Sequence, residues 1–231
     1  MEIDIQSKPL INIITRTRNR PNHFNICVQS LTQQGDVNLH HIVTYQVDED
    51  LEYINKYKYP NTTLVKVPNI TKDPHRHTYI DNNHLNHSPY NTFLNEAHKH
   101  VKEGWIMYLD DDDLLLYKNS IEVLYENIFS YDLDTKHFWR VKFPTYLLPD
   151  EKFWKSYVEG KPLKICQISM IGMLYHSNHL EKINFHEWAC GDYFAFSNLD
   201  KLLPKRNMIN SPLTGLQSSP GHGLRKDLKI E

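Results

Sequence analysis

The stretch GWIMYLDDDDLLLY, residues 104–117, places four consecutive aspartates between two apolar runs. The segment WIMYL before them is apolar throughout, as expected of a central strand covered on both faces of a sheet. Adjacent carboxylates repel one another unless water, basic side chains or a cation compensates their charge. The stretch therefore indicates either a solvated acidic loop or a metal site, and its position after a buried strand favours the metal site.

Segments of strand and helix character alternate on both sides of this run. Strands are expected over residues 10–17, 41–47, 62–67, 105–109, 137–143 and 165–176, and helices over residues 21–35, 90–104, 119–129 and 191–203. The residues from 211 to 231 are rich in Gly, Pro and Ser and are typical of a loop or tail. Strands alternating with helices predict an α/β fold with a largely parallel sheet.

The composition sets broad limits on function. With 231 residues, 40% hydrophobic and 23% charged, the chain is expected to form one soluble globular domain. Its net charge of −2 gives no reason to expect nucleic acid as a partner. Cys27, Cys166 and Cys190 form neither a disulfide framework nor a CxxC zinc motif, which favours a reducing compartment. With neither a signal peptide nor a transmembrane segment apparent, a cytoplasmic location is expected, and any membrane association would be peripheral.

The aspartates would lie at the carboxyl end of a central strand, where open parallel sheets bind their ligands. If the chain stays extended, Asp110 and Asp112 point to one side, and Asp111 and Asp113 point to the other. Two carboxylates on one side can share a hard divalent cation, so Mn²⁺ or Mg²⁺ is the expected cofactor. The alternative is a solvated acidic turn or the start of a helix.

Two segments resemble family 2 glycosyltransferases. YNTFLNEAHKHVKEGWIMYLDDDD, residues 90–113, is similar to the part of that family that runs from an Asn-containing helix through a Gly-aromatic strand to a DxD motif. INIITRTRNRPNHFNICVQSLTQQ, residues 11–34, resembles its opening strand and helix, where a Thr-x-Asn-Arg-type turn leads to Ser-Leu-x-x-Gln. The resemblance covers most of the first half of the chain. It implies a single Rossmann-like GT-A domain, a nucleoside-diphosphate sugar donor of UDP or GDP type, and a divalent metal.

The resemblance also implies roles for residues of the first half. Asp110 would contact the ribose or the donor sugar and would share the metal with Asp112, which Asp113 would assist. Asp111, at the variable position, would lie among the donor-binding residues, with a solvated neighbour as the alternative. The other expected donor-binding residues are Thr15, Arg16, Thr17, Arg18, Arg20, Asp48 (with Asp50 as the second choice) and Asn91. Arginine forks suit phosphate oxygens, although the family usually has proline where this chain has Arg16. A solvated basic turn and helix caps are the structural alternatives for these arginines and for Asp48 and Asn91.

An inverting transfer needs a base that deprotonates the acceptor hydroxyl, and the family places an acidic residue for this late in the chain. Asp192 is the first choice and Glu187 the second; a helix cap is the alternative for Asp192. Trp188 and Tyr193 are expected to bind the acceptor by stacking on a sugar, although core packing is the commoner use of such rings. In the C-terminal segment, His222 is expected to join the metal, and Arg225 or Lys226 to reach phosphate.

The sequence thus predicts a metal-dependent glycosyltransferase that transfers a sugar, with inversion, to a hydroxyl of a glycan, protein or small molecule. Residues 1–115 would form the nucleotide-binding half and residues 116–231 the acceptor-binding half, which ends in a flexible segment. An inactive nucleotide-sugar or glycan-binding module is one alternative. A nucleotidyltransferase is the other, but it would be expected to have a Gly-rich phosphate loop, and TRTRNRP (residues 15–21) contains no glycine.

Overall fold

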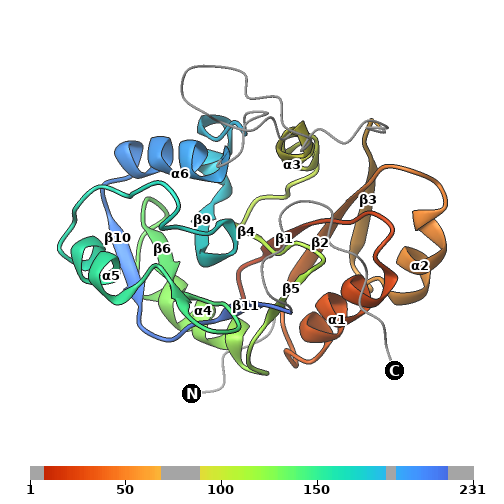
Figure 1. Cartoon of the computed structure of the whole chain (residues 1–231), viewed down its shortest axis with the longest axis horizontal. Helices are drawn as coiled ribbons and strands as arrows, with labels where there is room; N and C mark the ends of the chain where they lie inside the picture. Colours follow the sequence, from red (N-terminus) through yellow and green to blue (C-terminus); the bar gives the residue numbers. More distant parts are fainter. Residues whose placement is uncertain (1–7, 69–88, 186–190, 218–231) are drawn as a thin grey trace.

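The computed structural model describes residues 8–68, 89–185 and 191–217, and its centre is a seven-stranded sheet (Figure 1). The strand order is β10-β6-β9-β4-β1-β2-β3. The strands are β1 (Ile11–Arg16), β2 (Leu39–Tyr45), β3 (Thr62–Lys66), β4 (Trp105–Tyr108), β6 (Lys136–Trp139), β9 (Met173–His176) and β10 (Arg206–Ile209). All neighbours are parallel except β9, which runs antiparallel to both β4 and β6. The sheet is therefore mostly parallel, as the sequence predicts.

Helices cover both faces of this sheet (Figure 1). They are α1 (Pro21–Thr32), α2 (Asp50–Tyr57), α3 (Thr92–His98), α4 (Ser120–Phe129), α5 (Glu151–Val158) and α6 (Gly191–Leu202), with 3₁₀ turns at Pro89–Asn91, Met170–Gly172 and Ser177–Lys182. Ile13 and Ile14 of β1 are both fully buried but point to opposite faces, Ile13 toward α1 and α4, and Ile14 toward α3, α5 and α6. The apolar strands expected from the sequence are thus covered on both sides.

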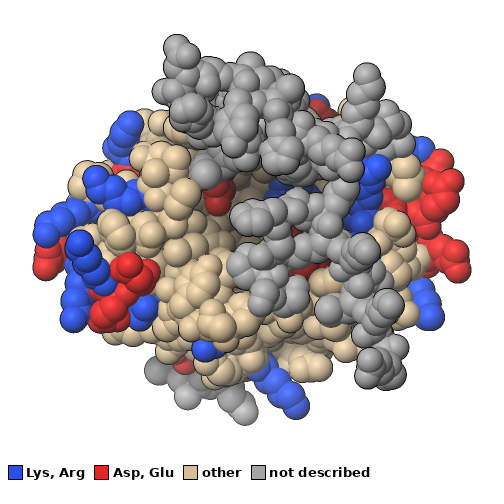
Figure 2. Space-filling model, in the orientation of Figure 1, with Lys and Arg blue, Asp and Glu red and all other residues tan. Residues whose placement is uncertain are grey.

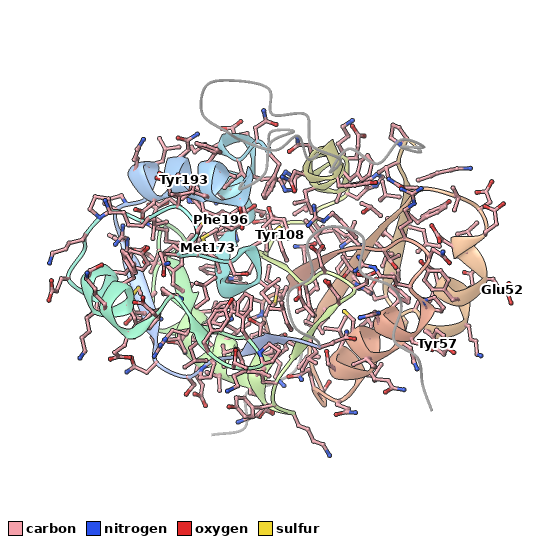
Figure 3. The ribbon with its side chains drawn as sticks, in the orientation of Figure 1. Glu52, Tyr57, Tyr108, Met173, Tyr193 and Phe196 are labelled. Carbon is pink, nitrogen blue, oxygen red and sulfur yellow. The ribbon has the colours of Figure 1, made fainter. Side chains whose placement is uncertain are left out.

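The core under α6 is rich in aromatic rings. Phe196 of α6 lies with its ring centroid 6.0 Å from that of Tyr108 of β4. The Tyr108 hydroxyl shares a hydrogen bond of 2.6 Å with that of Tyr175 on β9. Figure 3 shows Tyr193 and Phe196 on α6, with Met173 of β9 and Tyr108 nearby. This packing fixes α6, and hence Asp192 in its first turn, against the central strand β4.

A second, four-stranded sheet extends from the end of the central strand. Its order is β5-β11-β7-β8, formed by Asp113–Leu115, Thr214–Leu216, Val141–Lys142 and Leu147–Leu148. Strand β11 is antiparallel to β5, with Leu216 opposite Asp113 and Thr214 opposite Leu115. The last of the four aspartates is therefore also the first residue of this smaller sheet.

Most expected elements are present, and most of the differences lie in the second half of the chain. The segment 137–143 forms two strands, β6 and β7, in different sheets, and only the last four residues of 165–176 form a strand. The expected loop after residue 210 contains β11, while α2, α5 and β10 were not anticipated. The helix expected to reach Gly104 ends at His98. No helix within the described ranges combines the length and the apolar character that crossing a membrane requires.

Gly104 instead begins the approach to β4. Its φ is +148°, and a Cβ at this position would overlap the carbonyl oxygen of Leu10. Trp105 then donates its backbone N–H to the same carbonyl over 2.8 Å. The glycine is therefore required by the close approach of two backbones at the point where the central strand starts.

Candidate functional site

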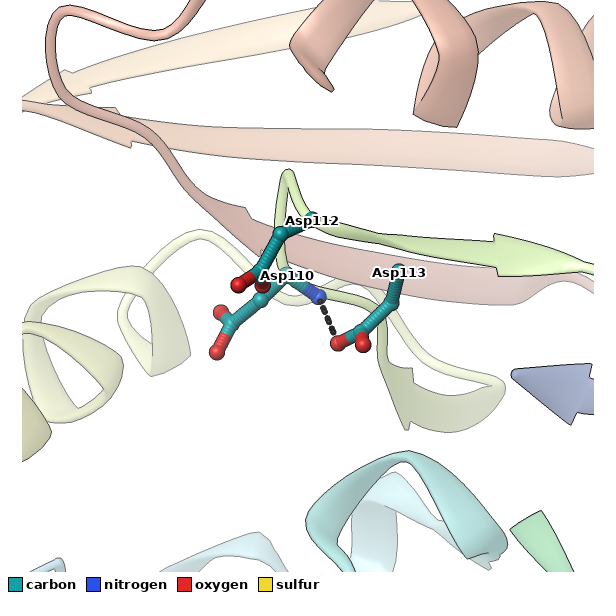
Figure 4. Close-up of side chains that lie close together, drawn as sticks. All are labelled: Asp110, Asp112 and Asp113. Carbon is teal, nitrogen blue, oxygen red and sulfur yellow. Dashed lines mark hydrogen bonds between the residues drawn. The ribbon is translucent and has the colours of Figure 1, made fainter. Parts of the chain in front are cut away.

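The acidic loop, residues 110–113, is a tight turn between β4 and β5. The Asp113 N–H donates to the Asp110 carbonyl over 2.9 Å, and the Asp110 N–H donates to the Asp113 carboxylate over 3.1 Å (Figure 4). This turn brings carboxylate oxygens of Asp110, Asp112 and Asp113 within 4.8 Å of one another. Three oxygen donors so close together match the preference of Mg²⁺ and Mn²⁺ for carboxylate ligands.

The turn changes the side-chain arrangement that an extended chain would give. Because the backbone turns here, the Asp113 side chain lies with those of Asp110 and Asp112. The prediction that Asp110 and Asp112 point to one side while Asp111 and Asp113 point to the other is therefore wrong. Asp111 is fully buried and forms an ion pair with Arg20 at 2.7 Å, so it is not the solvated neighbour of the alternative. Burial raises the pKa of Asp111, and the Arg20 charge opposes this shift.

Two arginines from the turn after β1 compensate the aspartates. Arg16 donates from Nε and Nη2 to the two carboxylate oxygens of Asp110, over 2.9 and 2.5 Å. Arg20 reaches Asp112 over 3.2 Å as well as Asp111. Because β1 and β4 are parallel neighbours, their carboxyl ends lie side by side and bring these groups together. Burial disfavours the charge on Arg16, but the hydrogen bonds to Asp110 and the negative charges of Asp110, Asp112 and Asp192 together outweigh burial and raise the pKa of Arg16.

The start of α3 is held to the same cluster through Arg16 and Arg18. Arg16 Nη1 donates to the Asn91 side-chain oxygen over 3.1 Å and to the Tyr90 carbonyl over 3.3 Å. Arg18 Nη1 donates to the Tyr90 hydroxyl over 3.1 Å. Asn91 thus lies beside the acidic loop, whereas Tyr90 was not among the residues singled out from the sequence.

The two threonines of β1 and its turn make contacts within the protein. The Thr15 hydroxyl donates to the Leu109 carbonyl over 2.6 Å and lies 2.9 Å from Nε2 of His41. The Thr17 hydroxyl lies 2.9 Å from that of Tyr53. Both threonine side chains are buried, so these contacts brace the end of β1 beneath the site. A role for either threonine in donor binding stays a prediction.

The two acidic residues considered after β2 have different surroundings. Asp48 has a side chain that is 68% exposed and pairs with Lys66 at 2.8 Å. Asp50 is buried and accepts a hydrogen bond of 2.8 Å from the backbone N–H of Asn19, in the turn that carries the arginines. Asp50, the second choice for a nucleobase contact, is therefore the one that is hydrogen-bonded to the arginine turn. A nucleobase contact by Asp48 or by Asp50 stays a prediction.

Asp192 lies in the first turn of α6, where its carboxylate accepts a hydrogen bond of 2.8 Å from the backbone N–H of Tyr193. The negative charge of Asp192 is among the causes that raise the pKa of Arg16, and the charge of Asp110 is among those that raise the pKa of Asp192. Burial raises the pKa of Asp192, and the Tyr193 N–H and Arg16 oppose that shift. Tyr193 is half-buried against the core. The predicted residues Glu187, Trp188, His222, Arg225 and Lys226 lie outside the described residues.

One contact to the acidic loop was missed entirely from the sequence. Gln217, directly after β11, donates its backbone N–H to the Asp112 carbonyl over 2.9 Å. Its side-chain amide nitrogen lies 2.8 Å from the Asp111 carbonyl, 3.0 Å from that of Asp113 and 3.0 Å from that of His23 on α1. The residue stands in the stretch that reads as a loop or tail, and no local pattern marks it.

Charges elsewhere on the surface do not form a continuous basic stripe on the face shown in Figure 2, where the described Lys and Arg side chains are interspersed with Asp and Glu.

No protein-family model and no curated protein sequence matches the chain. Solved structures do match it. S. aureus TarS 1–349 in complex with UDP-GlcNAc superposes with a TM-score of 0.67 at 14% identity, over 91% of this chain and 59% of that chain. The mannosyltransferase PcManGT from Pyrobaculum calidifontis, in complex with GDP-Man and Mn²⁺, superposes with a TM-score of 0.61 at 13% identity, over 92% of this chain and 58% of that chain.

Glucosyl-3-phosphoglycerate synthase from Mycobacterium tuberculosis, in complex with Mn²⁺, UDP and phosphoglyceric acid, gives a TM-score of 0.56 at 10% identity, over 94% of this chain and 73% of that chain. The chain thus spans about three fifths of the length of the TarS fragment and of PcManGT. At these identities the likeness concerns the fold, and it confirms the architecture that the resemblance implied. The chain has the GT-A fold.

Proposed function

We propose that this protein is a metal-dependent glycosyltransferase that moves a sugar from a nucleoside-diphosphate sugar of UDP or GDP type to an acceptor hydroxyl, with inversion. The observation that carries the proposal is the cluster of three carboxylates with Arg16 and Arg20 at the carboxyl edge of β1 and β4. Open α/β sheets bind ligands at this edge. The complexes of similar fold with UDP-GlcNAc, and with GDP-Man and Mn²⁺, support the choice of donor class.

The carboxylates of Asp110, Asp112 and Asp113 would hold Mn²⁺ or Mg²⁺, and His222 would add a ligand from the C-terminal segment. The donor set fits, since all three oxygens come from hard carboxylate ligands within 4.8 Å of one another. When bound, such a cation stabilises the negative charge that develops on the departing diphosphate.

The donor would lie across the turn after β1. Arg18 and Arg20 would bind its phosphates, because guanidinium groups form paired hydrogen bonds with phosphate oxygens. The remaining donor contacts are assigned to Thr15, Arg16, Thr17, Asp48, Asn91, Asp110 and Asp111. The hydrogen bonds of Arg16 to Asp110 and Asn91 would keep this surface in one arrangement before the donor arrives.

Asp192 would act as the general base. It would take the proton of the acceptor hydroxyl as that oxygen attacks the anomeric carbon, while the bond from this carbon to the diphosphate breaks and the nucleoside diphosphate leaves. The raised pKa of Asp192 makes the carboxylate a stronger base than an ordinary aspartate. Trp188 and Tyr193, on either side of Asp192 in the sequence, would bind a glycan, protein or small-molecule acceptor.

A thermal-shift panel of nucleoside diphosphates, with and without Mn²⁺, tests the proposal, because a ligand that binds the native state raises the melting temperature. We expect a Mn²⁺-dependent rise with UDP or GDP that is lost in Asp112→Asn. Asp132→Asn is the matched control, since Asp132 is a half-exposed aspartate paired with Lys205. If no nucleotide gives a metal-dependent shift, the proposed function is wrong. A shift with no sugar transfer to any acceptor would favour the binding-module alternative.

A further inference from the structure

The acidic loop presents its backbone carbonyls to a single residue from the far end of the chain. Asp111, Asp112 and Asp113 each direct a carbonyl oxygen to Gln217, which is more than 100 residues away in the sequence. The same side-chain nitrogen reaches the His23 carbonyl on α1. Gln217 therefore connects three consecutive residues of the loop to the helix that follows the arginine turn.

The carbonyl oxygens around the Gln217 side chain require a hydrogen-bond donor. Three carbonyl oxygens lie within 3.0 Å of the Gln217 amide nitrogen, whose two hydrogens they share. Oxygens gathered in this way repel one another unless a hydrogen-bond donor lies between them, and a buried carbonyl without a partner destabilises the fold. Among the residues of similar shape, glutamate offers only acceptors and methionine offers no donor.

The position of Gln217 is set by the smaller sheet. In the register of β11 with β5, Leu216 faces Asp113, so the next residue of the chain lies opposite Asp112. The fit of β11 is tight, because a Cβ on Gly215 would lie 2.9 Å from both a Leu116 methyl carbon and the Lys142 carbonyl. Gln217 cannot shift along the loop without breaking this register.

We infer that Gln217 is a positioning residue that sets the spacing of the metal-binding carboxylates through the backbone of the acidic loop. Its hydrogen bonds hold the carbonyls of Asp111, Asp112 and Asp113, and thereby fix the turn that brings Asp113 to Asp110 and Asp112. Removal of a group that orients metal ligands in this way typically lowers metal affinity about 10–100-fold. This inference rests on the proposed function, because it requires the loop to bind a metal.

The chain provides a matched control in Gln34, at the other end of α1. Its amide nitrogen donates to two carbonyls, those of Ser30 and Tyr117, over 2.9 and 2.8 Å, and its oxygen accepts from the Ile121 N–H. Gln34 is 98% buried and follows the end of α1, whereas His23 lies in the first turn of that helix, and the helix from His23 to Thr32 spans about 14 Å. It is thus a structural glutamine of the same kind, away from the acidic loop.

The test is a titration of the full chain with MnCl₂, followed by electron paramagnetic resonance of the free ion, on wild type, Gln217→Glu, Gln217→Met, Gln34→Glu and Gln34→Met. We expect both Gln217 variants to raise the Mn²⁺ dissociation constant about 10–100-fold. We expect the Gln34 variants to stay within about twofold of wild type even where thermal melts show lower stability. Each position is tested with an acidic and an apolar substitution. Comparing the Mn²⁺ affinities of these variants with their melting temperatures distinguishes loss of folded protein from loss of metal affinity.

Folded Gln217 variants that bind Mn²⁺ as tightly as wild type would overturn the inference and leave the proposed function intact. Equal losses in the Gln34 and Gln217 variants would also overturn it, because they would trace the effect to general stability. A wild-type chain that binds no Mn²⁺ would overturn both the inference and the proposed metal site.

Discussion

The contact between Arg16 and Asp110 yields the most specific stability prediction. Both side chains are mostly buried, with exposed fractions of 22% and 16%, and the carboxylate receives two hydrogen bonds from one guanidinium. Replacing Arg16 by methionine keeps much of the apolar stem but leaves the Asp110 carboxylate without this partner. It also removes the donor that reaches Asn91 and the Tyr90 carbonyl.

The expected loss follows from these contacts. Removing one partner of a buried ion pair costs about 3–5 kcal/mol, and the residual exposure here favours the lower end, about 3 kcal/mol. For a chain of this length, 1 kcal/mol corresponds to about 2–4 °C in melting temperature, so Arg16→Met should melt about 6–12 °C lower. The double variant Arg16→Met/Asp110→Asn should recover part of the loss, because it no longer leaves a charged carboxylate unpaired.

The assay is a double-mutant cycle by urea denaturation without metal, with thermal melts in parallel. A coupling energy of about 1–3 kcal/mol between Arg16 and Asp110 would agree with the structure. Lys66→Met is the control, since Lys66 pairs with Asp48 where both side chains are more than half exposed, and it should melt close to wild type. A loss below about 1 kcal/mol for Arg16→Met, or additive effects of the two substitutions, would refute the reasoning.

Three further outcomes are expected. Asp192→Asn should lower the transfer rate about 10²–10⁴-fold in a nucleotide-release assay, while the thermal shift caused by the donor persists; unchanged transfer would exclude Asp192 as the base. Because burial raises the pKa of Asp192, transfer should fall as the pH decreases through that raised value, and a rate that stays flat down to about pH 4 would contradict this. Gly104→Ala should lower the melting temperature more than Gly35→Ala does, since both have positive φ but only Gly104 would place a Cβ against Leu10; equal effects would argue against that overlap.

Most of the first half of the fold, with the exception of α2, could be predicted because its signals are local and long. Residues 10–17 form β1 within one residue at each end, and Pro21 begins α1 as expected. In the second half, β7, β8 and β11 have only two or three residues each, too few for a hydrophobic period to be visible. The expected strand 137–143 breaks at Arg140 because its two parts pair in different sheets, and sheet membership depends on partners that are distant in sequence.

The same distinction holds for the site. The four aspartates and the arginine turn could be found because each is a short run with an unusual charge. The burial of Asp111 could not, because it depends on the backbone reversing immediately after β4. Gln217 could not either, because its role depends on the register of β11 against β5, which joins residues about 100 apart. Local chemistry thus indicated the kind of site, and tertiary contacts determined its arrangement.

The place of β11 in the chain has a consequence for the order of folding during synthesis. The seven-stranded sheet has all its strands once the ribosome has released β10, which ends at Ile209. Thr214–Leu216 and Gln217 emerge only later, and until then β5 has no β11 to pair with. All strands of the large sheet can therefore be present before the acidic loop gains its hydrogen bonds to Gln217.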